Sequence, residues 1–360
     1  MNIEFLEVKA FFFGTEEQKR KTYFSFILPF FKEIDGEFSA ERDWNGGPHY
    51  RIILPKHHDQ LLVHFEKDFK AYVKREFGDL SKVELEENIE QYVKHHETIA
   101  GMESRSKEEI NAGRHLTVAI HSYDEAYLRQ TFNSYQHFVV HTQSLFFMQK
   151  FISSFGERFF NLPKEKKYLY FTKMLYEVLT FSSFHPKFAV LVYVSNIEGV
   201  FAIAEQYGKR AAFEKAYQTL YKSLPFETLA NDPEFNELGA TWKDTIGNIY
   251  SLIKENVKNL FTDEEGFYSK ELQKEELVQN IQGISSEFHD LLLKQDVEEW
   301  TNHEEHVIYR VLINIVYKSA HMLQFTFTEK NFACYAVCEY VMDKYHTTWR
   351  EIMAQRGINA

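Results

Sequence analysis

Cysteines, long apolar runs and an N-terminal basic segment are scarce or missing in this 360-residue chain, and each shortage excludes a class of protein. Two cysteines, Cys334 and Cys338, are too few for a secreted fold stapled by disulfides, and their helical spacing predicts that both pack as small apolar residues. No run of about 18 uncharged apolar residues occurs, so no membrane-spanning helix is expected. Segment 1–7 carries acidic but no basic residues and is not a signal peptide. We therefore expect a cytoplasmic protein.

Basic residues are also outnumbered by acidic ones: the chain has 41 Lys and Arg against 53 Asp and Glu, and its formal net charge is -12. An acidic chain without a basic run is a poor match to a nucleic-acid backbone, so no nucleic-acid partner is expected. The patterns G-x-G-x-x-G, G-x-x-x-x-G-K-[ST] and G-x-S-x-G are all missing, which removes the usual support for nucleotide-dependent enzymes and serine hydrolases. No organic cofactor is implied.

Three histidine pairs raise the question of metal binding. His303 and His306 are three residues apart, not in the H-E-x-x-H spacing that places two ligands on one zinc ion. The two glutamates between them favour the first turn of a helix instead. The adjacent pairs 57–58 and 95–96 are expected at the surface, because neighbours on a helix point in different directions. No metal site is predicted.

Apolar and aromatic residues are abundant: the hydrophobic content is 44%, with 34 Phe and 21 Tyr, which is ample for a sizeable core. Strand patterns occupy 5–13, 37–42, 44–55 and 115–121. Helical periodicity occupies 16–34, 59–77, 84–100, 124–155, 164–184, 195–217, 241–261, 272–293, 304–323 and 329–352. The predicted fold class is α+β, in a single domain 1–360 with a sheet-bearing lobe 1–190 and a mainly helical lobe 191–360.

Local signals refine this outline. Thr15 with Gln18 forms a capping box that starts the first helix, and Pro29 is expected to kink it. Ser195 with Glu198 fits a second capping box, a reading preferred to a catalytic serine. Segment 188–194 fits either a strand or the start of a helix, and the polar segment 101–113 fits a loop or mobile lid.

The most distinctive stretch is 42–55, where two glycines and a proline precede an alternating run. Proline directs the chain into a strand, so His49 and Arg51 share one face. Arg42 and Trp44 lie on the incoming limb. This arrangement suits the binding of a carboxylate or phosphate. The alternative is an edge strand whose arginine and histidine are solvated.

A second polar pattern lies on the helix predicted at 304–323. Arg310, Asn314, Tyr317 and His321 step by 4, 3 and 4 residues, so their polar tips form one stripe. Tyr309 precedes the stripe, and the other faces are apolar. A polar stripe that is buried without partners is costly, so this one faces either solvent or a polar cleft.

These two patterns resemble a known family. Segment 43–51 is similar to the W-x-G-G-P-H-x-R motif of the thiopeptide-type bacteriocin biosynthesis domain, which is also the C-terminal, elimination domain of lantibiotic dehydratases. The helix from Arg310 to His321-Met322, followed by Glu329, resembles the closing H-M segment of that domain. The helix at 195–217 is similar in placement, so the likeness spans nearly the whole chain, as in a free-standing member.

The resemblance implies action on a ribosomally made precursor peptide, with its leader and core. Elimination members remove glutamate from glutamylated Ser or Thr, with a separate glutamylating dehydratase subunit as a further partner. Related members join two dehydroalanines in a formal [4+2] cycloaddition and expel the leader. By motif position, Arg51 would bind the departing glutamate, His321 would act as acid or base, and His49 would stand beside them. Arg42, Trp44, Tyr309, Arg310, Asn314 and Tyr317 would bind substrate.

Two departures from the family pattern weaken the elimination reading. Ile53 stands where elimination domains carry a second arginine, so the bidentate grip on a carboxylate is lost. Leu323 and Gln324 stand where an N-R pair usually follows H-M. Cycloaddition depends on positioning between aromatic walls more than on cations.

Three classes of function stay open: a peptide-tailoring enzyme, a non-catalytic module that binds the precursor leader at a sheet edge, and an unrelated α+β protein. Convergence of Arg51 and His321 in one cleft would favour the enzyme. Replacement of Arg51 by alanine is expected to remove activity with little loss of fold, because a solvated strand arginine contributes little stability.

Overall fold

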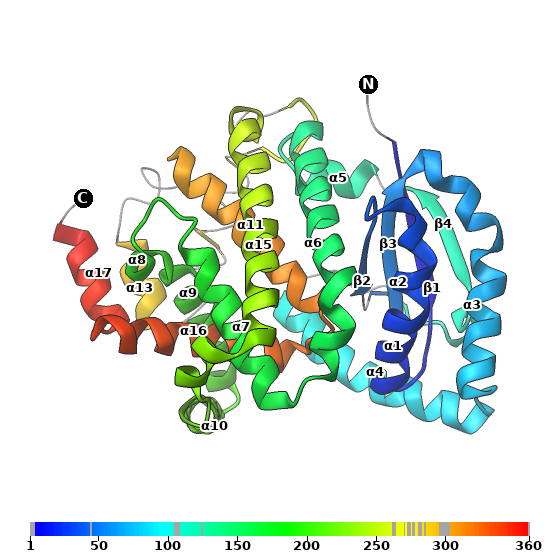
Figure 1. Cartoon of the computed structure of the whole chain (residues 1–360), viewed down its shortest axis with the longest axis horizontal. Coiled ribbons are helices and arrows are strands. Elements are labelled where there is room, and N and C mark those ends of the chain that lie inside the picture. Colours follow the sequence, from blue (N-terminus) through cyan, green and yellow to red (C-terminus); the bar gives the residue numbers. More distant parts are fainter. Residues whose placement is uncertain are drawn as a thin grey trace. The chain divides into compact units, whose positions relative to one another are not determined.

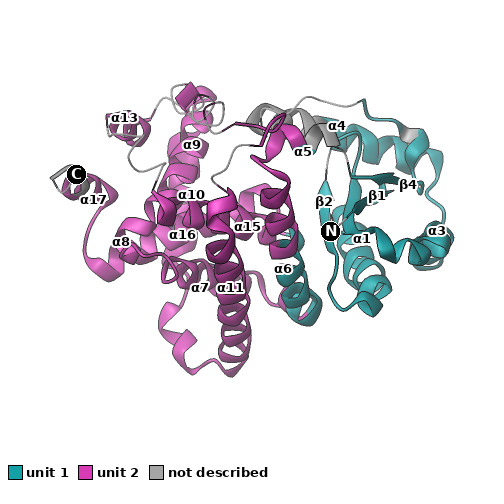
Figure 2. Ribbon diagram, turned by 90° about the horizontal axis from the view of Figure 1, so that it is seen from above, with its two compact units in different colours: residues 1–128, 145–157, 321–324 teal, residues 129–144, 158–320, 325–360 magenta. Residues whose placement is uncertain are grey.

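The structure is a computed structural model that describes residues 4–43, 45–103, 109–123, 125–260, 264–269, 271, 275, 278–279, 283, 286–294 and 303–358. The chain forms two compact units, coloured separately in Figure 2. Unit 1 comprises Met1–Leu128, Leu145–Glu157 and His321–Gln324, and unit 2 comprises Arg129–Ser144, Arg158–Ala320 and Phe325–Ala360. These units do not follow the expected lobe boundary at residue 190, because two long helices each contribute to both units.

Unit 1 is built on a four-stranded antiparallel sheet with strand order β2-β3-β1-β4 (Figure 1). Its strands are β1 (Phe5–Phe11), β2 (Ser39–Asp43), β3 (His49–Pro55) and β4 (Val118–Ser122). All four strands lie where apolar and aromatic patterns predict them. The α+β class is therefore confirmed.

The first helical run shows how local sequence sets backbone geometry. Thr15 and Gln18 form the predicted capping box at the start of α1 (Glu16–Thr22). A π turn, Tyr23–Ile27, follows, and then α2 (Leu28–Phe30) and the 3₁₀ turn Phe31–Ile34. Pro29 has no N–H and its ring clashes with the carbonyl four residues back, so the run changes helix type directly before it. The expected disturbance at Pro29 is confirmed.

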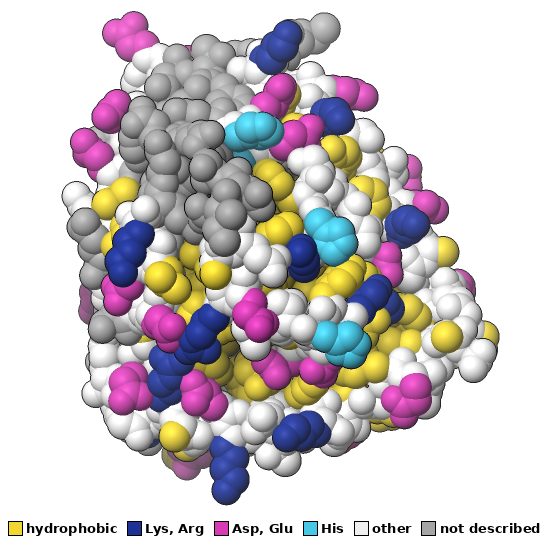
Figure 3. Space-filling model, turned by 90° about the vertical axis from the view of Figure 1, so that its left-hand side faces the viewer, with side chains coloured by type: hydrophobic (Ala, Val, Ile, Leu, Met, Phe, Trp, Pro, Cys, Tyr) yellow, Lys and Arg dark blue, Asp and Glu magenta, His cyan; other side chains and the backbone are white. Residues whose placement is uncertain are grey.

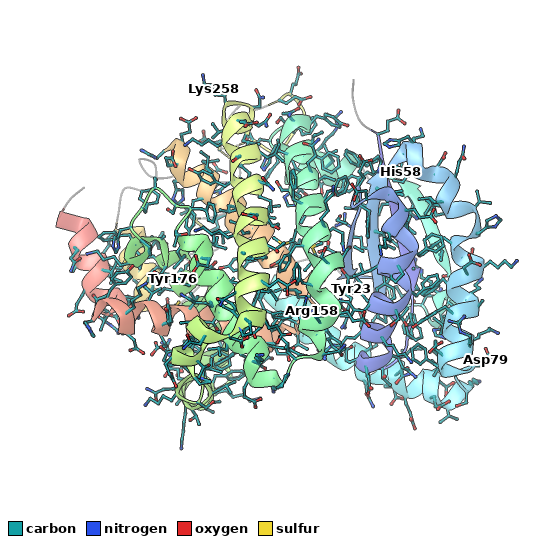
Figure 4. The ribbon with its side chains drawn as sticks, viewed as in Figure 1. Tyr23, His58, Asp79, Arg158, Tyr176 and Lys258 are labelled. Atoms are coloured by element: carbon teal, nitrogen blue, oxygen red, sulfur yellow. The ribbon has the colours of Figure 1, made fainter. Side chains whose placement is uncertain are left out.

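One face of the sheet is largely apolar and supports the core of unit 1. The Tyr50 hydroxyl donates to the carbonyl of Lys19 at 2.6 Å. The hydroxyl of Tyr23, which is labelled in Figure 4, donates to the carbonyl of Ala40 at 2.8 Å. The ring of Phe69, on α3 (Leu62–Phe77), meets the edge of Tyr50. Each fully buried aromatic side chain contributes about 1.5–3 kcal/mol, so this face holds the sheet to α1 and α3.

The remaining helices have the following bounds: α4 (Lys82–Glu103), α5 (Glu125–Thr131), α6 (Tyr135–Asn161), α7 (Lys164–Leu179), α8 (Pro186–Ala189), α9 (Leu191–Gln206), α10 (Arg210–Lys222), α11 (Pro233–Leu260), α13 (Glu287–Leu293), α15 (Glu304–Met322), α16 (Phe327–Tyr345) and α17 (Trp349–Ile358). Unit 2 is helical in its described part. Trp242 of α11 is fully buried, and its indole N–H donates to the carbonyl of Met174 on α7 at 2.9 Å.

Cys334 and Cys338 lie on α16 as buried free thiols, as their spacing predicts. Burial raises the pKa of Cys334 to about 12, which keeps this thiol protonated and unreactive. One helical stretch, Pro186–Gln206, is long and apolar enough by composition to cross a membrane, but 61% of its most apolar window is buried inside the protein. That burial is typical of a core helix.

Several predicted helices differ in their bounds from the observed ones, at places where polar residues interrupt the regular spacing of apolar residues. The single helix expected at 124–155 is two helices, because Ser134 caps a new start. The helix expected at 329–352 breaks at His346, which adopts a left-handed conformation with φ 49°. Segment 188–194 is helical. Much of 272–293 lies outside the described residues, as do 104–108 of the predicted lid.

The predicted capping box at Ser195 is wrong. Helix α9 begins at Leu191, so Ser195 lies inside it rather than at its start. Its hydroxyl is 3.1 Å from Nε2 of His289 on α13, and Nδ1 of that ring is 2.6 Å from the hydroxyl of Ser286. These contacts tie α13 to α9 through a buried imidazole.

Candidate functional site

The face of the sheet opposite Tyr50 carries charged side chains at its centre. Strand register places Glu7 and Lys9 of β1, Glu41 of β2 and Arg51 of β3 on this face. Glu7 is 6% exposed and Glu41 is 9% exposed, although glutamate is rarely buried unless it is paired. We call this surface the polar sheet face, and it comprises Glu7, Lys9, Glu41, Asp43, His49, Arg51, His121 and Tyr123.

Arg51 lies at the centre of the polar sheet face and bonds to three other side chains there. Its Nε donates to Oε1 of Glu7 at 2.5 Å, and its Nη1 donates to Oε1 of Glu41 at 3.3 Å. Its Nη2 donates to the hydroxyl of Tyr123 at 3.1 Å. The side chain is 12% exposed, so the expectation of a solvated arginine is wrong. Carboxylates from both neighbouring strands already hold the guanidinium.

His49 is a buried, neutral imidazole. Its Nδ1 lies 2.8 Å from the carbonyl oxygen of Gly47, which requires the proton to be on Nδ1. Burial lowers the pKa of His49, so the ring stays uncharged at neutral pH. Nε2 then carries a lone pair with no hydrogen-bond partner among the described residues, and the ring of Phe11 lies 4.9 Å away. This nitrogen has the chemistry of a proton acceptor.

Lys9 adds a cation to the same face. It lies directly across from Arg51 in the strand register and is half-buried. Its ammonium group forms no ion pair within the described part of the chain, whereas Arg51 has two. The polar sheet face therefore combines a paired guanidinium, an available ammonium group and a neutral imidazole.

Arg42 and Trp44 do not join this group. Arg42 pairs with Tyr50 in the register, so it lies on the opposite face of the sheet from Arg51. There its Nη2 lies 2.5 Å from Oε2 of Glu16 on α1. Burial raises the pKa of Glu16, but Arg42 and the neighbouring lysine outweigh it and bring the value down to about 2. Trp44 lies outside the described residues.

The predicted stripe on α15 is divided between the two units. His321 is half-buried at the C-terminal end of α15 and belongs to unit 1, as do His49 and Arg51. Tyr309, Arg310, Asn314 and Tyr317 belong to unit 2. The chain therefore places the three residues expected to do chemistry in one compact unit and four of those expected to bind substrate in the other.

The four α15 residues of unit 2 differ in their environments. Tyr309 is buried, and its hydroxyl donates to the carbonyl of Ala189 at 2.9 Å, so it serves as a structural tie. Asn314 is exposed and Arg310 is half-buried. The Tyr317 hydroxyl is buried without a hydrogen-bond partner in the described chain. Among these four, Tyr317 is the one that offers an unused buried polar group.

Tyr317→Phe tests that difference. Removal of an unpartnered buried hydroxyl relieves its desolvation cost, so we expect the free energy of unfolding to stay unchanged or rise by about 1 kcal/mol. The matched variant Tyr309→Phe leaves the carbonyl of Ala189 without its hydrogen bond. This variant should therefore lower the free energy of unfolding by about 1–3 kcal/mol. Urea unfolding of both variants measures the contrast. Equal losses would mean that the Tyr317 hydroxyl is bonded in the folded protein.

Arg310 also affects His137 on α6. Burial, with a smaller contribution from the charge of Arg310, lowers the pKa of His137 from 6.5 to about 4. The unfolded chain therefore binds a proton more readily than the folded one, and stability falls as the pH drops from 6.5 towards 4. The loss from this one group reaches about 3 kcal/mol.

His137→Asn removes this acid sensitivity. As the pH falls from about 6.5 to about 4, we expect the variant to lose less stability than the parent. At about pH 4 the two losses should differ by about 3 kcal/mol. Urea unfolding at several pH values measures the two slopes. Parallel slopes for parent and variant would contradict the assigned role of His137.

Sequence reasoning missed the two glutamates that surround Arg51. Glu7 and Lys9 alternate with apolar residues in β1, and this charge alternation is a local signal of a polar strand face. Which strand pairs with which is not local, so the meeting of Glu7 and Glu41 at one arginine could not be read from the chain. Ile53, at the position of the second family arginine, is 4% exposed on the same face.

Surface charge is mixed where it can be viewed directly. Figure 3 shows acidic, basic and apolar side chains interspersed on one face of the molecule, without a continuous basic stripe. This agrees with a net charge of -12.

The sequence matches no protein-family model and no curated protein. Several solved structures share its fold, and two of them are the following. One is titled "Pyridine synthase, TbtD, from thiomuracin biosynthesis", with a TM-score of 0.63 and 12% identity over 96% of this chain and 99% of that one. The other is TsrL, with a TM-score of 0.62 and 10% identity over 97% of each chain. The fold of these two proteins therefore extends across nearly the whole chain.

Proposed function

We propose that this protein tailors a ribosomally made precursor peptide by joining two dehydroalanines in a formal [4+2] cycloaddition that builds a pyridine ring. The observation that carries the proposal is the fold match to a pyridine synthase over 96% of the chain. The resemblance of segment 43–51 to the thiopeptide-type motif supports it independently, because that likeness comes from the sequence.

The state of Arg51 favours ring formation over glutamate elimination. Elimination needs cations that hold the departing glutamate carboxylate. Glu7 and Glu41 already occupy the Arg51 guanidinium, and Ile53 replaces the second arginine of the family pattern. A surface with two carboxylates around its central cation repels a third carboxylate more than it attracts one.

The neutral imidazole and the ammonium group suit the proton transfers of cycloaddition. One dehydroalanine amide must lose its N–H proton and gain a proton on its oxygen to become an aza-diene. We assign His49 Nε2 as the acceptor of the N–H proton and Lys9 as the donor to the oxygen. Two carbon–carbon bonds then form. Water leaves from the former carbonyl carbon, and the leader leaves as an amide, which makes the ring aromatic.

Three further residues complete the proposed chemistry. His321 is assigned to proton transfer when water and the leader depart, because the family likeness places an acid or base at its position. Phe11 and Tyr123 flank His49 and Arg51 respectively, with the Tyr123 ring centroid 5.6 Å from the guanidinium carbon. Aromatic rings of this kind can hold a planar substrate by contact rather than by charge.

A second candidate function is leader binding without catalysis. Strand β4 is an edge of the sheet, and its last three residues, 120–122, are exposed. The Tyr123 N–H donates to the carbonyl of Phe5, so by alternation the backbone groups of Val118, Ile120 and Ser122 point away from β1. An extended leader could pair with these groups as an added strand.

Mass spectrometry distinguishes the two candidates. A precursor peptide that carries dehydroalanines is incubated with the protein, and its mass is followed. Ring formation predicts a product lighter by one water and by the leader, together with free leader amide. An unchanged mass with saturable binding of the peptide would favour the leader-binding module. An unchanged mass without binding would refute both.

A further inference from the structure

Three side chains at one end of the sheet in unit 1 converge, although the sequence gives no reason to group them. Glu37 precedes β2, while His57 and His58 lie in the 3₁₀ turn Lys56–Leu61 that follows β3. Figure 4 labels His58. His58 Nε2 is 2.9 Å from Oε2 of Glu37, and His57 Nε2 is 3.5 Å from the same oxygen. One candidate ligand atom from each residue lies within 4.8 Å of the other two.

This convergence departs from the rule that neighbouring residues on a helix point in different directions. The two imidazole rings lie with their centroids 4.0 Å apart, and both turn towards the carboxylate. In a tetrahedral zinc site with bonds of about 2.0–2.1 Å, ligand atoms stand about 3.3 Å from one another. The two separations from the carboxylate oxygen, 2.9 and 3.5 Å, bracket that value.

The donor set also matches zinc in chemistry. Two imidazoles and one carboxylate, with water in the remaining position, form one of the usual three-ligand zinc sets. A simple ion pair would need only one histidine, whereas here both rings face the carboxylate.

We propose that Glu37, His57 and His58 form a binding site for Zn²⁺, with water completing the coordination. The ion would join the segment before β2 to the turn between β3 and α3, and so clamp two connections at the same end of the sheet. Glu37 and His57 are exposed, so the ion can enter from solvent without any opening of the core. None of the three residues belongs to the polar sheet face, because all three lie outside the strands.

Calorimetric titration of metal-free, full-length protein with ZnCl₂ tests the proposal. We expect one ion to bind per chain, and binding to weaken at least about tenfold in His58→Ala and in Glu37→Gln. His64→Ala, at an exposed histidine on α3, should bind as the parent does. All three variants should unfold as the parent does without zinc, because two of these side chains are exposed and the third, His58, lies at the surface.

Co²⁺ supplies an independent readout, since four-coordinate Co²⁺ with histidine ligands absorbs visible light. The parent should show these bands, and the double variant His57→Ala/His58→Ala should not. The proposal is overturned if zinc does not bind, or if the double variant binds it as tightly as the parent. It is also overturned if binding is lost only in His303→Ala/His306→Ala, which would place the ion at the start of α15.

Discussion

Arg51→Met should lower the free energy of unfolding by about 3–5 kcal/mol. The substitution keeps most of the side-chain volume but removes the charge that compensates Glu7 and Glu41. Those carboxylates are 8% and 12% exposed as side chains, so each would remain largely desolvated without its partner. An uncompensated buried charge is among the costliest changes that a single substitution can make. Urea unfolding measures the loss.

Two further variants separate this cause from a general loss of packing. Arg75→Met removes an arginine that is 68% exposed and should change stability by about 0–1 kcal/mol. The triple variant Glu7→Gln/Glu41→Gln/Arg51→Met removes all three charges together and should recover much of the stability that Arg51→Met loses. If Arg51→Met were as stable as Arg75→Met, the pairing around Arg51 would not contribute to the fold.

His49→Asn should lower kcat for ring formation by about 10²–10⁴-fold. The asparagine amide nitrogen can replace Nδ1 in its hydrogen bond to Gly47, so the local backbone should keep its conformation. Nothing replaces Nε2, and the proposed proton acceptor is lost. Product formation measured by mass spectrometry gives kcat for parent and variant, and circular dichroism checks that the fold is retained.

The pH dependence of activity adds a second readout for His49. Because burial lowers the pKa of His49, its imidazole stays uncharged even at pH values somewhat below 6.5, the ordinary pKa of histidine. We therefore expect kcat to hold at about pH 6.5 and to decline only at lower pH. The matched control is His64→Asn on α3, which should leave kcat unchanged. A fully active His49→Asn variant would contradict the assignment of the proton acceptor.

Local structure was readable from the sequence wherever a few neighbouring residues decide it. The capping box of Thr15 and Gln18 and the disturbance at Pro29 depend on contacts within one or two turns. Strand β3 (His49–Pro55) lies within the strand predicted at 44–55 from its alternation and from the proline at position 48. The same reasoning failed at Ser195, because an apolar helix can begin several residues before the first capping pattern in its sequence.

The candidate site was predictable only in part, because its partners come from three strands. Alternation placed His49 and Arg51 on one face, as the register bears out. Arg42 was grouped with them by proximity in sequence, yet the register places it on the other face. The two glutamates that bind Arg51 follow from the strand order β2-β3-β1, which is set by packing of the whole sheet rather than by any local signal.

The central claim is that this protein closes a ring on its peptide substrate and does not eliminate glutamate. The most direct test offers both substrates at once: a glutamylated precursor peptide and a dehydrated precursor peptide of distinct mass, in one incubation with the protein. We predict that the dehydrated peptide alone reacts and loses one water and its leader. Loss of glutamate from the other peptide, with the dehydrated one unchanged, would contradict the account.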